Sequence, residues 1–212
     1  MLLRVKFLCL SYWKSMQIKA SNKKLKILDF DLENRPISYA GNDFTFSDVT
    51  AIAASFVGSR EVKVWAIPEV SYEEMLAEFK IMYDKADMVT GHNIRKHDLP
   101  ILRGAMLEFG IGILSPKLTS DTYLDLISFS GVSKSQENLS DMYGLPASKF
   151  HMNQNSWRQA NRLTAEGIAL TKKRVISDVK QHKQLRNRLI EANALRGPKM
   201  WTGKSTFTVG NH

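Results

Sequence analysis

The sequence has almost no cysteine: Cys9 is the only one among 212 residues. One cysteine cannot form an internal disulfide, and it excludes a zinc site built from several cysteines. A chain of this kind suits a reducing compartment, so we expect a cytoplasmic protein.

Long hydrophobic runs are also absent. The opening stretch MLLRVKFLCLSYWK is interrupted by Arg4, Lys6 and Lys14, is too short to span a bilayer, and lacks a small-residue cleavage site. We therefore predict neither a signal peptide nor a membrane anchor. Met16 would be a second sensible start, and our hypothesis is that residues 1–24 form a poorly ordered basic extension. The intact mass of protein made from its native message would identify the start.

Acidic residues are missing from the first part of the chain and scarce near its end. Residues 1–26 hold seven Lys or Arg and no acid, while residues 172–204 hold ten Lys or Arg against two acids. Because these ends carry +7 and +8 of a total of +9, residues 27–171 carry −6. An acidic centre between basic ends suits a protein that binds a phosphate backbone and holds metal ions among carboxylates. A solvated helix face with basic tails explains the charge equally well.

The length and the 43% hydrophobic content fit one globular domain with a sizeable core. Short β-rich runs over residues 26–69 predict a meander, and DMVTG (87–91) and the start of PKLTSDTYLDLISF (116–129) predict two more strands. Helices are predicted at 71–86, capped by Ser71, at 98–109, shortly after residue 120, at 135–145, and from Thr164 to about 195. Residues 147–163 are interpreted as a loop or lid. This order predicts the α/β class, a mixed sheet flanked by helices in a single domain.

The stretch KILDFDLENRP predicts a strand with one oily face and one acidic face. Side chains alternate along a strand, so Leu28, Phe30 and Leu32 point one way. Asp29, Asp31 and Glu33 point the other way. Crowded carboxylates repel each other, so we expect Lys or Arg partners, or a divalent metal, beside them. For an isolated D-x-E motif, a solvated edge strand is the commoner explanation.

Two further acids lie far away in the sequence. Asp98 precedes LPILRGAM at the end of a predicted strand, where α/β sheets place their sites, although capping of the helix would also explain it. Asp178 lies mid-helix, three residues after Val175 on the apolar stripe, and an inward Asp is costly unless it is paired. Arg174 and His182, four residues before and after Asp178, could each pair with it.

The ordered set FDLENRP, GHNIRKHDLPILR and RVISDVKQH resembles the DEDD superfamily of 3′→5′ exonucleases, which have a ribonuclease H-like fold. Asp31 and Glu33 match the D-x-E motif, Asp98 matches the Asp that follows Asn93 by five residues, and Asp178 matches the late-helix Asp. The resemblance covers residues 25–195, the expected exonuclease-like domain, and leaves 196–212 as a polar tail. SDTYLDLISF, SQENLSDMYGLP and ALRGPKMW are similar to segments of phage and bacterial members, which implies the host cytoplasm if a phage encodes the chain.

The resemblance implies metal-dependent 3′→5′ exonuclease activity with two divalent cations, Mg²⁺ or Mn²⁺. Asp31 would bridge both ions, Glu33 and Asp178 would complete one site, and Asp98 would hold the other through water. Family members place a Tyr four residues, or a His five residues, before the last Asp, where this chain has Arg174 and Lys173. Neither is a convincing base at neutral pH. His182 and His97 are the nearby imidazoles, and Arg174 is a possible transition-state helper.

Asp29 also departs from the family, where this position is usually apolar. We expect it to be an outer carboxylate or an ion-pair partner of Lys26 or of a later Arg.

The expected partner is nucleic acid, single-stranded DNA in preference to RNA, together with replication or repair proteins. Trp157 could stack on a terminal base, although a core position explains it equally well. The alternatives are an inactive nucleic-acid-binding protein with the same fold and a structure-specific endonuclease. The residues expected to contact nucleic acid are Asn93, Trp157, Lys172, Lys173, Lys180, Lys183 and Arg186.

Overall fold

A computed structural model describes residues 25–36, 47–147 and 149–203. Its centre is a six-stranded mixed sheet with the strand order β3-β2-β1-β4-β5-β6. Strand β1 pairs antiparallel with β2 and parallel with β4, β4 pairs parallel with β5, and the two outer pairs are antiparallel. The strands are β1 (Ile27–Pro36), β2 (Ser47–Phe56), β3 (Lys63–Ala66), β4 (Met88–Gly91), β5 (Lys117–Asp121) and β6 (Lys199–Trp201).

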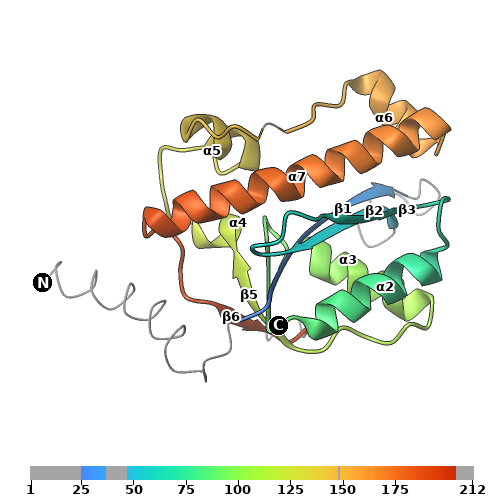
Figure 1. The fold of residues 1–212 in the computed structure, drawn as a ribbon, viewed down its shortest axis with the longest axis horizontal. Helices are drawn as coiled ribbons and strands as arrows, with labels where there is room; N and C mark the ends of the chain where they lie inside the picture. Colours follow the sequence, from blue (N-terminus) through green and yellow to red (C-terminus); the bar gives the residue numbers. More distant parts are fainter. Residues whose placement is uncertain (1–24, 37–46, 148, 204–212) are drawn as a thin grey trace, which may run out of the picture.

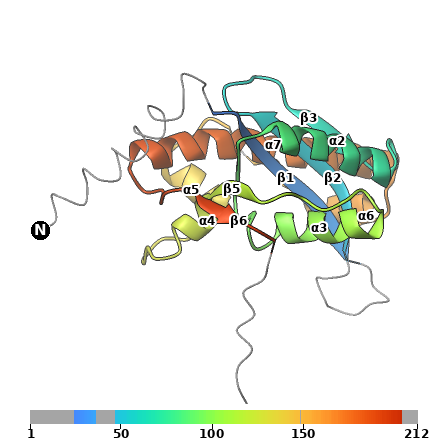
Figure 2. The same ribbon diagram turned by 90° about the horizontal axis from the view of Figure 1, so that it is seen from below.

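Helices cover both faces of the sheet, as Figures 1 and 2 show. The long helix α7 crosses one face, and α2 and α3 lie against the other. These layers confirm the predicted α/β class, a ribonuclease H-like mixed sheet in a single compact domain. The helices are α2 (Tyr72–Lys85), α3 (Asp98–Glu108), α4 (Thr122–Asp125), α5 (Gln136–Met142), α6 (Gln154–Asn161) and α7 (Ala165–Glu191).

The two faces of β1 differ as predicted, one being apolar and the other acidic. Leu28, Phe30 and Leu32 enter the main hydrophobic core with residues of α2 and α3. The acidic face turns toward α7, and there Ala51 and Ala53 of β2 stand opposite Glu33 and Asp31. Small side chains let a helix approach the sheet closely, because no long side chain separates the backbones. The sequence of β2 therefore brings α7 near the acidic face of β1.

Helix α7 begins where the sequence predicts, since Thr164 is its N-cap and accepts a hydrogen bond from the Gly167 amide. Its inward side buries Val175, Val179 and Leu185, and Asp178 lies on the same side. The predicted apolar stripe and the inward Asp are therefore confirmed.

Two local expectations need correction. Residues 154–161 of the predicted loop form helix α6, which Asn153 caps by accepting from the Ser156 amide. Residues 199–201 of the predicted polar tail form β6, which pairs antiparallel with β5 and adds a strand that was not predicted. Residues 37–46 of the predicted meander and the basic extension 1–24, with Met16, lie outside the described residues.

Among the residues described, no helix is both long enough and apolar enough to cross a membrane.

Candidate metal centre

Three of the four predicted acids meet between β1 and α7. One carboxylate oxygen from each of Asp31, Glu33 and Asp178 lies within 4.8 Å of the others. Alternation along β1 directs Asp31 and Glu33 to the α7 face, and the register of β1 against β2 shifts only after Glu33. These three acids therefore form a group that can hold a metal ion.

Asp98 comes to the same region from the first turn of α3 and is 2% exposed. The N-cap of α3 is His97 and makes no side-chain capping bond, so the structure does not support capping as the role of Asp98. Its Oδ1 is buried without a hydrogen-bond partner in the described part of the chain, as is Oδ1 of Asp178. Buried carboxylate oxygens without donors are costly, and a bound cation would satisfy them.

Burial raises the pKa of every member of this group, and repulsion between carboxylates adds to it at Asp31, Glu33 and Asp98. Desolvation, followed by the charges of Asp98, Asp178 and Glu33, holds the pKa of Asp31 well above its ordinary value. Desolvation raises the pKa of Glu33 to about 7 against the opposing effect of Arg174, and it raises that of Asp98 to about 7. The pKa of Asp178 is also raised, mainly by burial. Without a cation, the centre favours bound protons.

Two basic side chains already contact the acids. The Arg174 Nε lies 3.1 Å from Asp178 Oδ2 and 3.3 Å from Glu33 Oε1. The Lys149 Nζ lies 3.5 Å from Asp178 Oδ2. The i,i+4 pair of Arg174 with Asp178 confirms one of the predicted pairings. Lys149 was missed, because it comes from an irregular segment far from Asp178 in sequence and no local pattern marks it.

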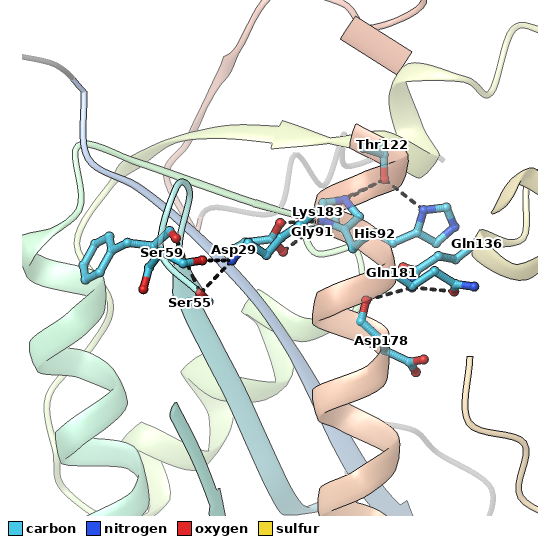
Figure 3. A network of polar contacts seen from close by, with 12 residues as sticks. Asp29, Ser55, Ser59, Gly91, His92, Thr122, Gln136, Asp178, Gln181 and Lys183 are labelled. Atoms are coloured by element: carbon cyan, nitrogen blue, oxygen red, sulfur yellow. Dashed lines mark hydrogen bonds and ion pairs between the residues drawn. The ribbon is translucent and has the colours of Figure 1, made fainter. Parts of the chain in front are cut away.

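His182 does not face the metal centre as a free base. Its Nδ1 lies 2.8 Å from Asp29 Oδ2, and its Nε2 lies 3.1 Å from Thr122 Oγ1. Both ring nitrogens are thus engaged, which corrects the prediction that His182 pairs with Asp178 or activates water. This histidine is also the hydrogen-bond partner of Asp29, and the charge of Asp29 acts on a later Arg, the buried Arg186, as expected. Figure 3 shows Asp29 and Thr122 within this polar network beside α7.

The network continues toward the start of the loop after β4. Thr122 Oγ1 lies 2.9 Å from His92 Nδ1 and also donates to the Gly91 carbonyl at 3.3 Å. Burial, with His182 as a lesser cause, lowers the pKa of His92 to about 3, so this ring is neutral. Thr122 therefore ties the ends of β4 and β5 to α7.

The loop that carries Asn93 is held by Asp121, the last residue of β5. Its carboxylate accepts from the Asn93 amide at 3.0 Å and the Arg95 amide at 2.9 Å, and it caps α4 at the Leu124 amide. Asn93 adopts a φ of 68°, and its Oδ1 is buried without a partner in the described chain. Sequence reasoning missed Asp121, although an Asp between a strand and a helix is a recognisable signal for a cap.

Gln136 of α5 is another residue that the sequence did not identify. Its Nε2 donates to the backbone carbonyl of Asp178 at 2.9 Å and to Gln181 Oε1 at 3.1 Å (Figure 3). A buried amide that bonds the helix backbone at Asp178 fixes the position of that residue.

The predicted basic face of α7 is only partly exposed. Arg186 is 4% exposed, and Lys183 donates to Ser55 Oγ and to the Ser59 carbonyl, so neither is placed to bind a phosphate backbone. Arg186 is buried because it lies two turns after Asp178, on the same inward side of the helix. Lys172 pairs with Glu69, whereas Lys173 and Lys180 are exposed.

Trp157 and His97 keep more open positions. Trp157 is half-buried on α6, with the Arg174 Cζ 5.8 Å from its ring centre. His97 is half-buried, and burial lowers its pKa, which keeps the ring neutral.

The donor set suits a hard divalent cation, because every candidate ligand is a carboxylate oxygen and two such oxygens are buried without partners.

No family model matches the chain, and no curated protein is similar to it in sequence. Among solved structures, the chain is similar in fold to the family B DNA polymerase from the hyperthermophilic archaeon Pyrobaculum calidifontis. The TM-score is 0.66 at 15% sequence identity, over 79% of this chain and 25% of the polymerase. The match therefore spans a quarter of the polymerase, and what the two chains share at this identity is the fold.

Proposed function

We propose that the chain is a metal-dependent 3′→5′ exonuclease that hydrolyses phosphodiester bonds at single-stranded nucleic-acid ends. The observation that carries the proposal is the convergence of Asp31, Glu33 and Asp178 within 4.8 Å, with the unpaired Oδ1 of Asp98 beside them. These four residues match the ordered DEDD motifs, although no local feature of the sequence joins them.

In this proposal the four carboxylates hold two divalent cations, Mg²⁺ or Mn²⁺. Asp31 contributes to both sites, Glu33 and Asp178 to one, and Asp98 to the other. When bound, such ions supply a reactive water at neutral pH and stabilise the leaving 3′ oxygen.

The remaining roles belong to other side chains. His97 precedes Asp98 in the sequence and is kept neutral by burial, so it is the candidate base. Arg174 cannot accept a proton, and its role is to place positive charge near the reacting phosphate. Trp157, Lys173 and Lys180 contact the strand that leads to the site.

Two observations bear on the substrate. The net charge of +9 suits a nucleic acid of either kind, and the structural neighbour is a DNA polymerase, which favours DNA. We place the preference with single-stranded DNA rather than RNA, and replication or repair proteins are the expected partners.

An assay with end-labelled oligonucleotides tests the function directly. DNA and RNA strands labelled at the 3′ or the 5′ end are incubated with the protein and Mg²⁺ or Mn²⁺. We expect release of single nucleotides from the 3′ end only. Asp31→Asn and Asp98→Asn should each lower the rate about 100-fold, because each removes charge from the cation sites.

The matched control is Asp141→Asn, which removes the same charge from an exposed position on α5 and should leave the rate unchanged. Release that begins at the 5′ end, or cleavage that persists in EDTA, would contradict the proposal. Internal cuts in a circular substrate would identify an endonuclease instead.

A second candidate function is nucleic-acid binding without turnover. The contacts of Arg174 and Lys149 with the acids favour it, because they neutralise charge that metal ions would otherwise use. It predicts binding that weakens with salt and no cleavage at any metal concentration.

A further inference from the structure

Arg174 fills one side of the acidic centre. Its Nε is buried and lies within 3.3 Å of both Glu33 and Asp178, yet it makes no well-aligned hydrogen bond to either. Its Nη1 donates to the Phe150 carbonyl at 2.7 Å, and its Cζ lies 5.8 Å from the centre of the Trp157 ring. Arg174 is thus anchored to the segment before α7 while it pairs with both acids.

The centre also contains carboxylate oxygens that no base in the described chain contacts. Both basic partners of Asp178 contact its Oδ2. Oδ1 of Asp178 and Oδ1 of Asp98 are buried without hydrogen-bond partners in the described residues. The ion pairs of Arg174 and Lys149 in this centre are with Glu33 and Asp178, and neither base pairs with Asp98. The centre therefore holds a guanidinium at Glu33 and Asp178 and, at Asp98, a buried oxygen that no donor in the described part of the chain satisfies.

The net charge of the centre also favours one bound ion. Four ionised carboxylates carry −4, and Arg174 with Lys149 returns +2, which leaves −2. One divalent cation neutralises this centre. A second would leave +2 in a desolvated site, where uncompensated charge is costly.

We propose that, in the chain without nucleic acid, Arg174 takes the place of the divalent cation at Glu33 and Asp178, so that a single ion binds, beside Asp31 and the unpaired Oδ1 of Asp98. Arg174 then supplies the second positive charge of the centre. This inference rests on the metal site of the proposed function, and it concerns how many ions that site takes. It also gives the position usually held by a Tyr in the DEDD superfamily a different role in this chain.

The test is a Mn²⁺ titration of the full chain, followed by calorimetry and by the electron paramagnetic resonance of free Mn²⁺. The wild-type chain should bind one ion. Arg174→Gln should bind two, and its first ion should bind about tenfold more tightly, because a positive charge within a few ångströms of the ion is gone. Arg174→Lys, which keeps the charge, should retain one ion.

Two controls separate position from charge. Lys149→Gln also removes one positive charge, but it leaves Arg174 between Glu33 and Asp178, so the first ion should tighten while the count stays at one. Arg188→Gln changes an exposed arginine of the same helix that pairs with Glu191, and it should bind as the wild-type chain does. Thermal melts establish that each variant is folded.

Two ions in the wild-type chain, none at all, or a count of one in Arg174→Gln would overturn the inference. A count of two in Lys149→Gln would overturn the assignment of position. Because ions are counted without a substrate, the result is independent of the exonuclease assay. A chain with no nuclease activity whose ion count still rises in Arg174→Gln would contradict the proposed function alone.

Discussion

Asp29 illustrates at the scale of one residue how a buried acid can be stable without a metal. It is fully buried, and both of its carboxylate oxygens lie within 2.9 Å of His182 Nδ1. Asp31, two residues further along the same face, has Asp98, Asp178 and Glu33 as charged neighbours instead. Two Asp residues on one strand thus have opposite surroundings. Only Asp31, which lies among other carboxylates, calls for an added cation.

The raised pKa values of the acidic centre predict how stability depends on pH in the absence of metal. The pKa of Glu33 rises from 4.5 to about 7, and that of Asp98 from 3.8 to about 7. Between these values the folded chain holds protons that the unfolded chain releases, so the free energy of unfolding falls as pH rises. Each group contributes a slope of about 1.4 kcal/mol per pH unit inside its window.

The measurement is urea unfolding in EDTA at several pH values between 4.5 and 7.5, for the wild-type chain and for Glu33→Gln with Asp98→Asn. The comparison is needed because His92, with its pKa lowered to about 3, contributes a slope of the opposite sign below its ordinary value of 6.5. The advantage of the wild-type chain over the double variant should decrease with rising pH. An advantage that increases with pH in EDTA would refute the reasoning.

At the scale of elements, two pairs of residues join the acidic face of β1 to α7. Two residues along a strand advance about 6.6 Å, and four residues along a helix advance about 6 Å. The pair of Asp29 with His182 and the pair of Asp31 with Asp178 use these two spacings, so one register satisfies both. The first pair joins an acid to an imidazole. It holds in place the second pair, in which two carboxylates repel each other.

We predict that the pair of Asp29 with His182 stabilises the contact between β1 and α7 and so holds Asp31 near Asp178. Asp29→Ala and His182→Ala should each destabilise the fold by about 3 kcal/mol, since each leaves a buried polar partner alone. The double variant should cost less than the sum of the two, with a coupling of about 1 kcal/mol or more. Urea unfolding measures all three. His151→Ala is the control, because this exposed histidine pairs with Glu137 at the surface and should cost less than about 1 kcal/mol.

The loop after β4 gives a second prediction at this scale. Asp121 accepts from two amides of the loop that leads to Asp98, and Arg95 pairs with both Asp121 and Asp125. Asp121→Ala should release the loop and weaken Mn²⁺ binding about tenfold, although Asp121 is not among the proposed ligands. A Mn²⁺ titration checks this. Asp141→Ala should leave the affinity unchanged, and an equal loss in both variants would show that the effect is not specific to the loop.

The elements that the sequence predicts are those with a strong local period. Alternation located β1 and its two faces, and the three-residue step from Val175 located the inward Asp178. The partners of these residues were not predictable in the same way, because Lys149 and Gln136 reach α7 from other segments through contacts that only the folded chain creates. The burial of Arg186 was within reach, since it lies eight residues after Asp178 on the same helix face.

At the scale of the whole molecule, helix α7 separates the two kinds of charge. The acids of the metal centre lie between β1 and α7, while exposed lysines of α7 lie on the outer side of the helix. The segment of Lys149, Phe150 and Trp157 contacts both kinds of charge. Lys149 pairs with Asp178, and the Phe150 ring lies 4.2 Å from the exposed Lys173 Nζ. Under the proposed function, a strand held by the lysines would pass this segment on its way to the acids.

Binding of nucleic acid should distinguish the exposed lysines of α7 from the buried ones. Lys173→Gln and Lys180→Gln each remove a cation that solvent can reach, so each should lower the salt slope of single-stranded DNA binding by about one. Lys183 donates to Ser55 and Ser59, and Arg186 is buried, so Lys183→Gln and Arg186→Gln should lower thermal stability and leave the slope unchanged. Fluorescence anisotropy at several salt concentrations, paired with thermal melts, measures both quantities. An equal fall of the salt slope in all four variants would contradict this prediction. It would mean that the inward and outward sides of α7 contribute equally to DNA binding, although the inward side packs against the sheet.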